Sequence, residues 1–549
     1  MEEKAAVRRA DMREFMTALK AKLNRCSDSE KVRWGEIVRL PFRQLQTQLQ
    51  SGEISAEQAL TAFRWNAIAA QEATNCICEW IADAGARARA LDSKYGQDGA
   101  PPKPPLFGMP VSIKEHLYVE DCDGTMGFAH LLEKPAGEDG ACVALLKAAG
   151  AVPFCTTNFP QTLISYACSN PVYGTTDHPM EGKRSRCPGG SSGGEAALTA
   201  LHGNALGIGT DGGGSIRVPS AFCGIVGLKP TAARMCQMGV HVPSYGMLKG
   251  IGATMGPMAR DVDALVEASK VLFNGPDCRT DPYRKALPFH LALYDSASPL
   301  TIGYYDDDGY FETTPTMKRA VELAKIHLKE KGHNLVPWKP PSAKEAFEAD
   351  IAGFINDGGA AITALTKQTL LREALHADLD EFFDPQRRAA WAERGGYRQK
   401  ELARAMFSTA GDVERSFAFI DPLRYQVVAE WNAAGIDAVL GPATPFPAIE
   451  HRYAGRLLAG LCYTAYYNVL DCPAGVVPVT RVTAEDEAAV SADYERVDAW
   501  SDMVVASFGS GSGSVGLPAA VQLAARHGQD EIVLRVMKEL EPLYAAICE

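Results

Sequence analysis

One glycine-rich stretch, residues 189–231, limits the possible folds of this chain more than any other segment. It reads GGSSGGEAALTALHGNALGIGTDGGGSIRVPSAFCGIVGLKPT, so two serines stand between glycine pairs and a third serine follows three glycines. Glycine reaches backbone conformations with positive φ at no steric cost and leaves its amide groups uncovered. The stretch therefore predicts two tight turns that each present a serine, separated by the helix EAALTALHG and the strand ALGIG.

The third serine, Ser215, has surroundings suited to a nucleophile. Acyl transfer needs an activated hydroxyl and N–H donors directed at the oxyanion that forms on attack. We expect the backbone N–H groups of Gly212, Gly213, Gly214 and Ser215 to form that oxyanion hole. A plain glycine-rich turn is the alternative, but the apolar run SIRVPSAF that follows favours a buried and shaped turn.

The candidate base is a lysine, Lys114, in the short apolar run GMPVSIKE. A serine nucleophile needs a partner that takes its proton. The nearest of the eleven histidines, His202, ends a helical segment, where we expect a partly cationic ring. A lysine acts as a base when burial lowers its pKa. We predict that Ser191 passes the proton between Lys114 and Ser215; a surface lysine at a strand end is the alternative.

The segments GMPVSIKE, GGSSGG, GTDGGGSIR and GLKPT, in this order, resemble the amidase signature family. The resemblance implies a serine hydrolase with an α/β fold, in which a single large domain holds a twisted mixed β-sheet flanked by helices. The family's catalytic lysine, cis-serine and nucleophilic serine match Lys114, Ser191 and Ser215, and its supporting residues match Ser192, Asp211 and Arg217.

Further segments resemble the branch of this family that hydrolyses fatty acid amides, among them YTAYYNVLDCPAGVVPVTRVTAEDE and SVGLPAAVQ. That branch cleaves N-acylethanolamines and primary fatty acid amides to fatty acid and amine, and its members are usually homodimers. The resemblance therefore implies a lipid-like amide substrate, an apolar acyl channel and a homodimer. It places the acyl chain against residues that ordinary core packing would also explain: Leu163, Ile164, Ser165, Leu461, Ala465 and Trp500.

The motifs divide the chain into a charged helical arm at 1–35 and an amidase signature domain at 36–549. Within the domain we expect the signature core at about 105–260 and a substrate-channel or cap region at about 355–470. In that region RGGYRQKELARAMFSTAGDVERSF has the pattern of a solvated helix rather than a membrane wedge, which leaves peripheral membrane contact open. GSGSGS at 509–514 predicts a flexible loop.

Composition argues against several other classes of protein. A formal net charge of −12 disfavours nucleic acid and an anionic membrane surface as partners. The fourteen cysteines form no CxxC pair and no spacing suggests zinc, so we expect buried free thiols, no metal and no cofactor. The sequence shows no signal peptide and no apolar run of about 20 residues, so we expect a location in the cytoplasm or peripherally on an intracellular membrane.

Other interpretations remain open from the residues alone. GIGTDG at 207–212 matches the dinucleotide-binding pattern GxGxxG, although Pro219 and the lack of a carboxylate downstream disfavour it. GGSSG at 189–193 matches the GxSxG nucleophile elbow, which would make Ser191 the nucleophile. Within the family, the chain could instead be an amidase for short or aryl amides, or a glutamine-hydrolysing amidotransferase subunit that passes ammonia to a partner.

Overall fold

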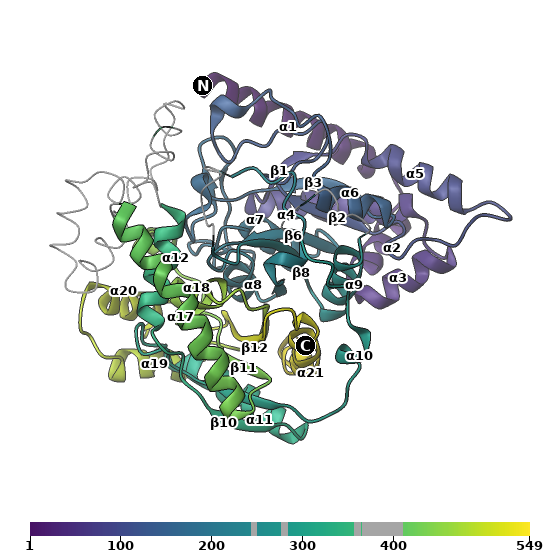
Figure 1. Cartoon of the computed structure of the whole chain (residues 1–549). Helices are drawn as coiled ribbons and strands as arrows, with labels where there is room; N and C mark the ends of the chain where they lie inside the picture. Colours follow the sequence, from purple (N-terminus) through teal and green to yellow (C-terminus); the bar gives the residue numbers. More distant parts are fainter. Residues whose placement is uncertain (243–249, 276–280, 282–283, 356–363, 365–409, 549) are drawn as a thin grey trace.

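The computed structural model describes residues 1–242, 250–275, 281, 284–355, 364 and 410–548, and an eleven-stranded mixed sheet runs through it (Figure 1). The strand order is β1-β3-β2-β6-β8-β7-β12-β13-β11-β9-β10. The strands are β1 Ile77–Trp80, β2 Pro110–Lys114, β3 Val152–Thr157, β6 Leu206–Asp211, β7 Val226–Lys229, β8 Thr254–Ala259, β9 Thr301–Tyr304, β10 Asn334–Pro337, β11 Ala438–Pro442, β12 Ala474–Arg481 and β13 Pro518–Ala525. A separate two-stranded sheet pairs β4 Ser169–Asn170 with β5 Gly174–Thr175.

Helices cover both faces of this sheet (Figure 1). The first group, at the purple end of the colour scale, is α1 Glu2–Asn24, α2 Asp28–Arg39, α3 Phe42–Ser51, α4 Ala56–Thr74 and α5 Ala84–Tyr95. The central group is α6 Ala141–Ala148, α7 Gly193–Ala200, α8 Arg217–Cys223, α9 Val262–Phe273, α10 Leu291–Tyr294, α11 Pro315–Glu330 and α12 Ala343–Phe354. The last group is α17 Ala410–Ala434, α18 Cys462–Val469, α19 Ala484–Asp493, α20 Ala499–Phe508 and α21 Asp530–Cys548. The predicted α/β fold with a mixed sheet flanked by helices is therefore confirmed.

Strand direction brings the predicted lysine and the glycine-rich loop to the same edge of the sheet. β2 pairs in parallel with β6, so the carboxyl ends of the two strands lie side by side. β2 ends at Lys114 and β6 ends at Asp211, immediately before the three glycines. The parallel pairing of β2 with β6 therefore places the candidate base next to the candidate nucleophile loop.

The alternation of side chains along β13 separates two hydrophobic cores. Successive strand residues point to opposite faces. Val521 and Leu523 pack into the core that contains α9 and α21, while Ala520 and Ala524 pack into the core that contains α8, α12 and α18. Gln522 falls on the second face, where a polar side chain needs a partner. This register places the side-chain amide of Gln522 next to α8, the helix that follows the candidate nucleophile loop.

The amino-terminal segment is helical, as predicted for the arm at 1–35, but it does not stand apart from the rest. α2 continues to Arg39, and Trp34, Ile37 and Val38 belong to the main hydrophobic core. On α1, Arg8 forms ion pairs with Glu79 of β1 and with Asp123. These contacts attach both helices to the sheet that carries the site.

His202 differs from its expected state. It follows α7 with φ of 56°, and burial together with the neighbouring Arg260 lowers its pKa to about 4. Arg260 Nη1 lies 2.6 Å from His202 Nδ1 and donates to it. The prediction of a partly cationic ring is wrong, because desolvation and a cationic neighbour outweigh the attraction of a helix C-terminus.

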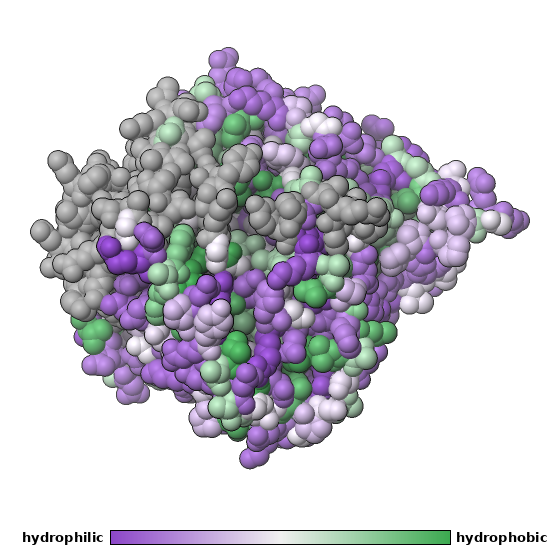
Figure 2. Space-filling view, viewed as in Figure 1, coloured by the Kyte–Doolittle hydropathy of each residue, from purple (hydrophilic) through white to green (hydrophobic). Residues whose placement is uncertain are grey.

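In the regions that the structure describes, no helix combines enough length with enough apolar character to cross a bilayer. Figure 2 shows one face of the molecule, on which hydrophilic residues predominate and apolar residues appear at separate points. Part of the predicted cap region at about 355–470, residues 356–363 and 365–409, lies outside the described residues. The remainder includes β11 of the main sheet and α18.

The loop expected to be flexible at 509–514 is held by one buried carboxylate. Glu487 accepts hydrogen bonds from the backbone of Gly511, Ser514 and Val515 and from the hydroxyls of Ser512 and Ser514, at 2.7 to 3.2 Å. A charged acceptor that satisfies several donors at once orders a glycine-rich segment that has no apolar anchor of its own.

We predict that Glu487→Ala releases this loop. Partly buried amides lose their acceptor, which costs about 1–3 kcal/mol of stability. Hydrogen–deuterium exchange at 511–515 should accelerate and the melting temperature should fall. Glu485→Ala, which removes an exposed carboxylate of the same helix, is the control and should leave the exchange of this loop unchanged. Unaltered exchange in the Glu487 variant would contradict the assignment.

Candidate active site

Lys114 lies fully buried at the end of β2, where its amine contacts hydroxyls rather than carboxylates. Its Nζ is 2.6 Å from Ser191 Oγ and 2.9 Å from Thr210 Oγ1. Burial lowers the pKa of Lys114 from 10.5 to about 7, because hydroxyl groups replace little of the hydration that a charged amine loses. An amine of this kind is uncharged in much of the population near neutral pH and has a lone pair to accept a proton.

The two adjacent serines connect this amine to the glycine-rich loop. Ser191 follows a cis peptide bond from Gly190, and α7 begins two residues later. Ser192 donates its backbone N–H to the carbonyl oxygen of Ser215 at 3.0 Å. Its hydroxyl also bonds the backbone of Thr210, accepting from N–H and donating to C=O at 3.2 Å each. The serine pair is thereby tied to both ends of the loop that carries Ser215.

Ser215 sits between strand β6 and helix α8, and it is accessible where its neighbours are not. From residue 211 to residue 230 it is the one residue that is not buried. Ser191, by contrast, is 2% exposed and lies next to the lysine. A nucleophile must be reached by its substrate, whereas a residue that only passes protons is best enclosed. Accessibility therefore favours Ser215 over Ser191 as the nucleophile.

The backbone N–H groups of the glycine loop, residues 212–215, differ in their hydrogen bonding. Gly214, at φ of 131°, donates its N–H to Asp211 Oδ1 at 2.8 Å. The N–H groups of Gly212, Gly213 and Ser215 make no hydrogen bond to any residue that the structure describes. The Gly214 amide is thus engaged in holding the loop, in contrast to its expected part in the oxyanion hole. The other three predicted donors are free to bind an oxyanion.

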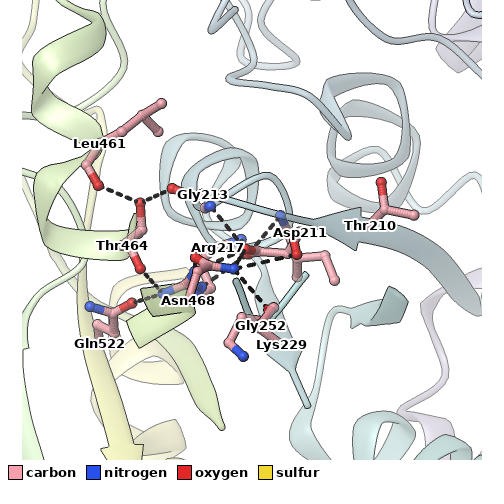
Figure 3. A network of polar contacts seen from close by, with 12 residues as sticks. Thr210, Asp211, Gly213, Arg217, Lys229, Gly252, Leu461, Thr464, Asn468 and Gln522 are labelled. Carbon is pink, nitrogen blue, oxygen red and sulfur yellow. Dashed lines mark hydrogen bonds and ion pairs between the residues drawn. The ribbon is translucent and has the colours of Figure 1, made fainter. Parts of the chain in front are cut away.

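A buried ion pair supports this loop from below (Figure 3). Arg217 and Asp211 are both fully buried and form two hydrogen bonds, Nε to Oδ2 at 3.0 Å and Nη2 to Oδ1 at 2.8 Å. Burial alone would raise the pKa of Asp211, but Arg217 and, at longer range, Lys229 outweigh it and lower that pKa. The carboxylate is therefore charged while it accepts the Gly214 amide.

Residues far along the chain complete the ion pair. Arg217 Nη1 donates to the Thr464 carbonyl at 2.8 Å and to Gln522 Oε1 at 2.6 Å, and Nη2 donates to Asn468 Oδ1. Thr464 Oγ1 donates to the Gly213 carbonyl at 2.6 Å. The motif did not reveal these three partners. The one signal in the sequence concerns Thr464 and Asn468. They are polar residues four apart in an apolar segment, so they lie on one face of a helix.

Thr210 and Asp350 are two further residues that the motif did not reveal. Thr210 directly precedes Asp211, yet its side chain lies apart from the Arg217 cluster in Figure 3 and contacts Lys114 instead. Asp350 of α12 lies against Gly213, where an added Cβ would come within 2.8 Å of its Oδ2. Burial raises the pKa of Asp350 well above its usual value, so it adds no second negative charge beside the oxyanion loop.

The residues predicted to contact an acyl chain fall in two apolar clusters. Ile164, Ala465 and Trp500 are buried in one cluster, with Leu461 packed against it, and Trp500 stacks on Phe311 at 5.7 Å. Leu163 belongs to a different cluster. Ser165 is half-buried, and its hydroxyl accepts the Ala167 N–H at 3.0 Å. The contact of these residues with an acyl chain, which the resemblance implies, stays a prediction.

The rival motifs lack their structural context. Residues 207–211 of the GxGxxG match lie within β6, not in a turn that leads directly into a helix. No strand of the described structure runs into Gly189 and Gly190, so the GxSxG match lacks the strand of a nucleophile elbow. Among the described residues, no cluster of three or more His, Cys, Asp or Glu side chains is arranged to hold a metal ion.

Comparison with known proteins agrees with this geometry. A family model described as Amidase matches residues 58–534. Fatty-acid amide hydrolase 1 from Sus scrofa is 38% identical, over 93% of this chain and 86% of that protein. Fatty acid amide hydrolase 1 from Caenorhabditis elegans is 36% identical, over 94% of this chain and 89% of that protein. A solved structure of a fatty acid amide hydrolase matches with a TM-score of 0.83 at 24% identity, covering 99% of this chain and 95% of that one.

A mixed sheet that brings a lysine and serines together at one edge is, with these matches, the structure of an amide-hydrolysing enzyme. The chain belongs to the amidase family, and specifically to the amidase signature group that its motifs indicated.

We predict that Arg217→Met destabilises the protein severely. It leaves Asp211 charged and buried without its cation, a loss of about 3–5 kcal/mol. The melting temperature should fall, and hydrolysis of an amide substrate should fall with it. The double variant Asp211→Asn/Arg217→Met, which removes both charges, should recover much of the lost stability. A single variant that unfolds at the wild-type temperature would show that the pair does not support the fold.

Proposed function

We propose that this chain hydrolyses fatty acid amides, namely N-acylethanolamines and primary fatty acid amides, to fatty acid and amine. The identity of 36–38% to two proteins named fatty acid amide hydrolase, over most of each chain, supports this substrate class. The chemistry rests on one observation above all: a buried lysine amine with a pKa of about 7 lies 2.6 Å from Ser191, beside a loop whose Ser215 is accessible.

In the proposed acylation step, two proton transfers among three groups of this chain accompany the formation of one bond. The lone pair of Lys114 accepts the proton of Ser191 as Ser191 accepts the proton of Ser215. The Ser215 oxygen bonds to the amide carbonyl carbon, and the carbonyl oxygen becomes an oxyanion. The backbone amides of Gly212, Gly213 and Ser215 stabilise this oxyanion, each donor contributing about 3 kcal/mol.

The same groups then work in reverse. The carbon–nitrogen bond breaks as the departing nitrogen receives the proton from Lys114 through Ser191, which leaves an acyl ester on Ser215. A water molecule gives its proton to the Ser191–Lys114 pair, attacks the ester and releases the fatty acid with Ser215 protonated again. Each half-reaction returns the lysine to its uncharged form, so the base is regenerated without an external acid.

Several finer features belong to the same proposal. In this proposal the acyl chain contacts the residues that the resemblance implies, four of which pack in or against one apolar cluster: Leu163, Ile164, Ser165, Leu461, Ala465 and Trp500. The homodimer, the peripheral membrane contact, the cytoplasmic or membrane-peripheral location and the division into an arm and a signature domain stay predictions. Hydrolysis of short or aryl amides and a glutamine-dependent transferase role are the alternatives that the first experiment separates.

A substrate panel tests the proposed activity. Purified protein is offered an N-acylethanolamine of long chain, oleamide, acetamide, an aryl acylamide and glutamine, and release of amine or ammonia is measured. We expect kcat/KM to be highest for the two long-chain amides, because only they bury an extended apolar chain. Preference for acetamide or the aryl amide would overturn the substrate class, and activity on glutamine alone would favour a transferase subunit.

Two serine variants are the controls for this panel. Ser215→Ala should abolish both hydrolysis and covalent labelling by a fluorophosphonate, since it removes the attacked oxygen. Ser191→Ala should slow labelling while Ser215 still becomes modified, as mass spectrometry of the labelled peptide would show. Modification of Ser191 in the wild-type protein would assign the nucleophile to the GxSxG match instead.

The pH dependence of kcat/KM should follow the lysine. Its uncharged form is the active one, so kcat/KM should rise through a pKa of about 7 and level off above it. Well below that pH, kcat/KM should fall about ten-fold per pH unit. Lys114→Ala should lose this acidic limb and about 100- to 10,000-fold in rate. Lys229→Met, which changes another buried lysine, is the control and should keep the limb. A Lys114 variant with an unchanged profile would exclude the base.

A further inference from the structure

His116 lies two residues beyond Lys114 and is 2% exposed. Both nitrogens of its ring have partners. Nδ1 is 2.7 Å from the carbonyl oxygen of His241, and Nε2 is 2.9 Å from Thr210 Oγ1. Thr210 Oγ1 is in turn 2.9 Å from Lys114 Nζ. A continuous chain of hydrogen bonds therefore runs from a backbone carbonyl through a histidine and a threonine to the lysine.

The direction of each hydrogen bond in this chain follows from the carbonyl at its end. A carbonyl oxygen only accepts, so Nδ1 of His116 must carry a proton and donate it to His241. Burial and, second to it, the neighbouring Lys114 lower the pKa of His116 to about 3, so the ring is uncharged and Nε2 has no proton. Nε2 is therefore an acceptor, and the partner that donates to it is the hydroxyl of Thr210.

The direction of the hydrogen bond from Thr210 to His116 also fixes the direction of the one between Thr210 and Lys114. A hydroxyl has one proton, and the proton of Thr210 is directed at His116, so toward Lys114 the threonine oxygen can only accept. Lys114 must donate one of its N–H groups to Thr210. The uncharged amine has two N–H groups and one lone pair, and Ser191 Oγ, at 2.6 Å, is the other hydroxyl in contact with it.

We propose that His116 is a positioning residue, which acts through Thr210 to keep the Lys114 lone pair available to the proton of Ser191. If the Thr210 proton were free, it could bond to that lone pair and compete with Ser191. With Thr210 fixed as an acceptor, the same contact also suits the state after proton transfer, when the ammonium group donates to both oxygens. The inference rests on the proposed role of Lys114 as base.

The ring itself supplies the first test, which needs no activity. Nitrogen-15 NMR of histidine-labelled protein, with the signal assigned by its loss in His116→Gln, should show His116 uncharged and protonated on Nδ1 from pH 5 to pH 9. Lys114 and His241 are the titratable groups that face it, and a positive charge on either of them would favour the same neutral state. A proton on Nε2, or a ring that titrates near its usual pKa in this range, would overturn the proposal.

A double-mutant cycle tests the connection to catalysis. His116→Phe keeps a ring of similar size but removes the acceptor, so kcat should fall about ten-fold or more with KM little changed. Thr210→Val should cost a similar factor. Because His116 acts through Thr210, adding His116→Phe to Thr210→Val should cost less than about two-fold more. Equal losses from His116→Phe in both backgrounds would show that the histidine matters only for packing.

The conservative variant separates positioning from folding. His116→Gln offers an acceptor oxygen near the place of Nε2 and an N–H₂ group, so it should recover most of the kcat that His116→Phe loses. Melting temperatures of both variants show whether a loss comes from unfolding. A Gln variant as slow as the Phe variant, at wild-type stability, would contradict the proposal. Failure of Lys114 as base would appear separately, as an unchanged pH profile in Lys114→Ala.

Discussion

Arg217 carries a positive charge into the interior of the protein, and much of the site depends on how that charge is satisfied. The guanidinium donates to Asp211, to the Thr464 carbonyl and to the side chains of Asn468 and Gln522. Two of these partners lie on α18 and one lies on β13, about half the chain away in sequence. A planar group with five donors can hold several elements in fixed relation. Here it holds the loop before α8 against α18 and β13, which come much later in the sequence.

Lys114 is buried as deeply as Arg217, but its surroundings favour the uncharged form of its side chain. Its direct contacts are hydroxyls, which are neutral partners and do not offset the cost of burying an ammonium group. The buried carboxylate at the end of β6, Asp211, already pairs with Arg217 and accepts the Gly214 amide. It is therefore not a partner for the amine of Lys114. The site thus contains one guanidinium that supports the loop and one amine whose pKa burial lowers to about 7, the group that we propose as the base.

The sequence predicted the parts of the site that lie close together along the chain. Ser191, Ser192, Asp211, Ser215 and Arg217 stand within one stretch, and Lys114 lies in a strand whose neighbour leads into that stretch. Thr464, Asn468 and Gln522 could not be found in this way, because their partner is fixed by tertiary packing. Two local errors have physical causes: His202 is neutral because of burial and Arg260, and the loop at 509–514 is ordered because Glu487 accepts its donors.

The last two residues of β6 show how one strand serves both halves of the chemistry. Neighbouring residues of a strand point to opposite faces of the sheet, so Thr210 and Asp211 cannot reach the same partner. Thr210 turns toward Lys114 and His116, the groups that we propose to hold and direct the proton. Asp211 turns toward Arg217 and holds the Gly214 amide. A shift of one residue in the pairing of β6 would exchange these faces, so the register of β6 with β2 and β8 determines the surroundings of both the proposed base and the proposed oxyanion loop.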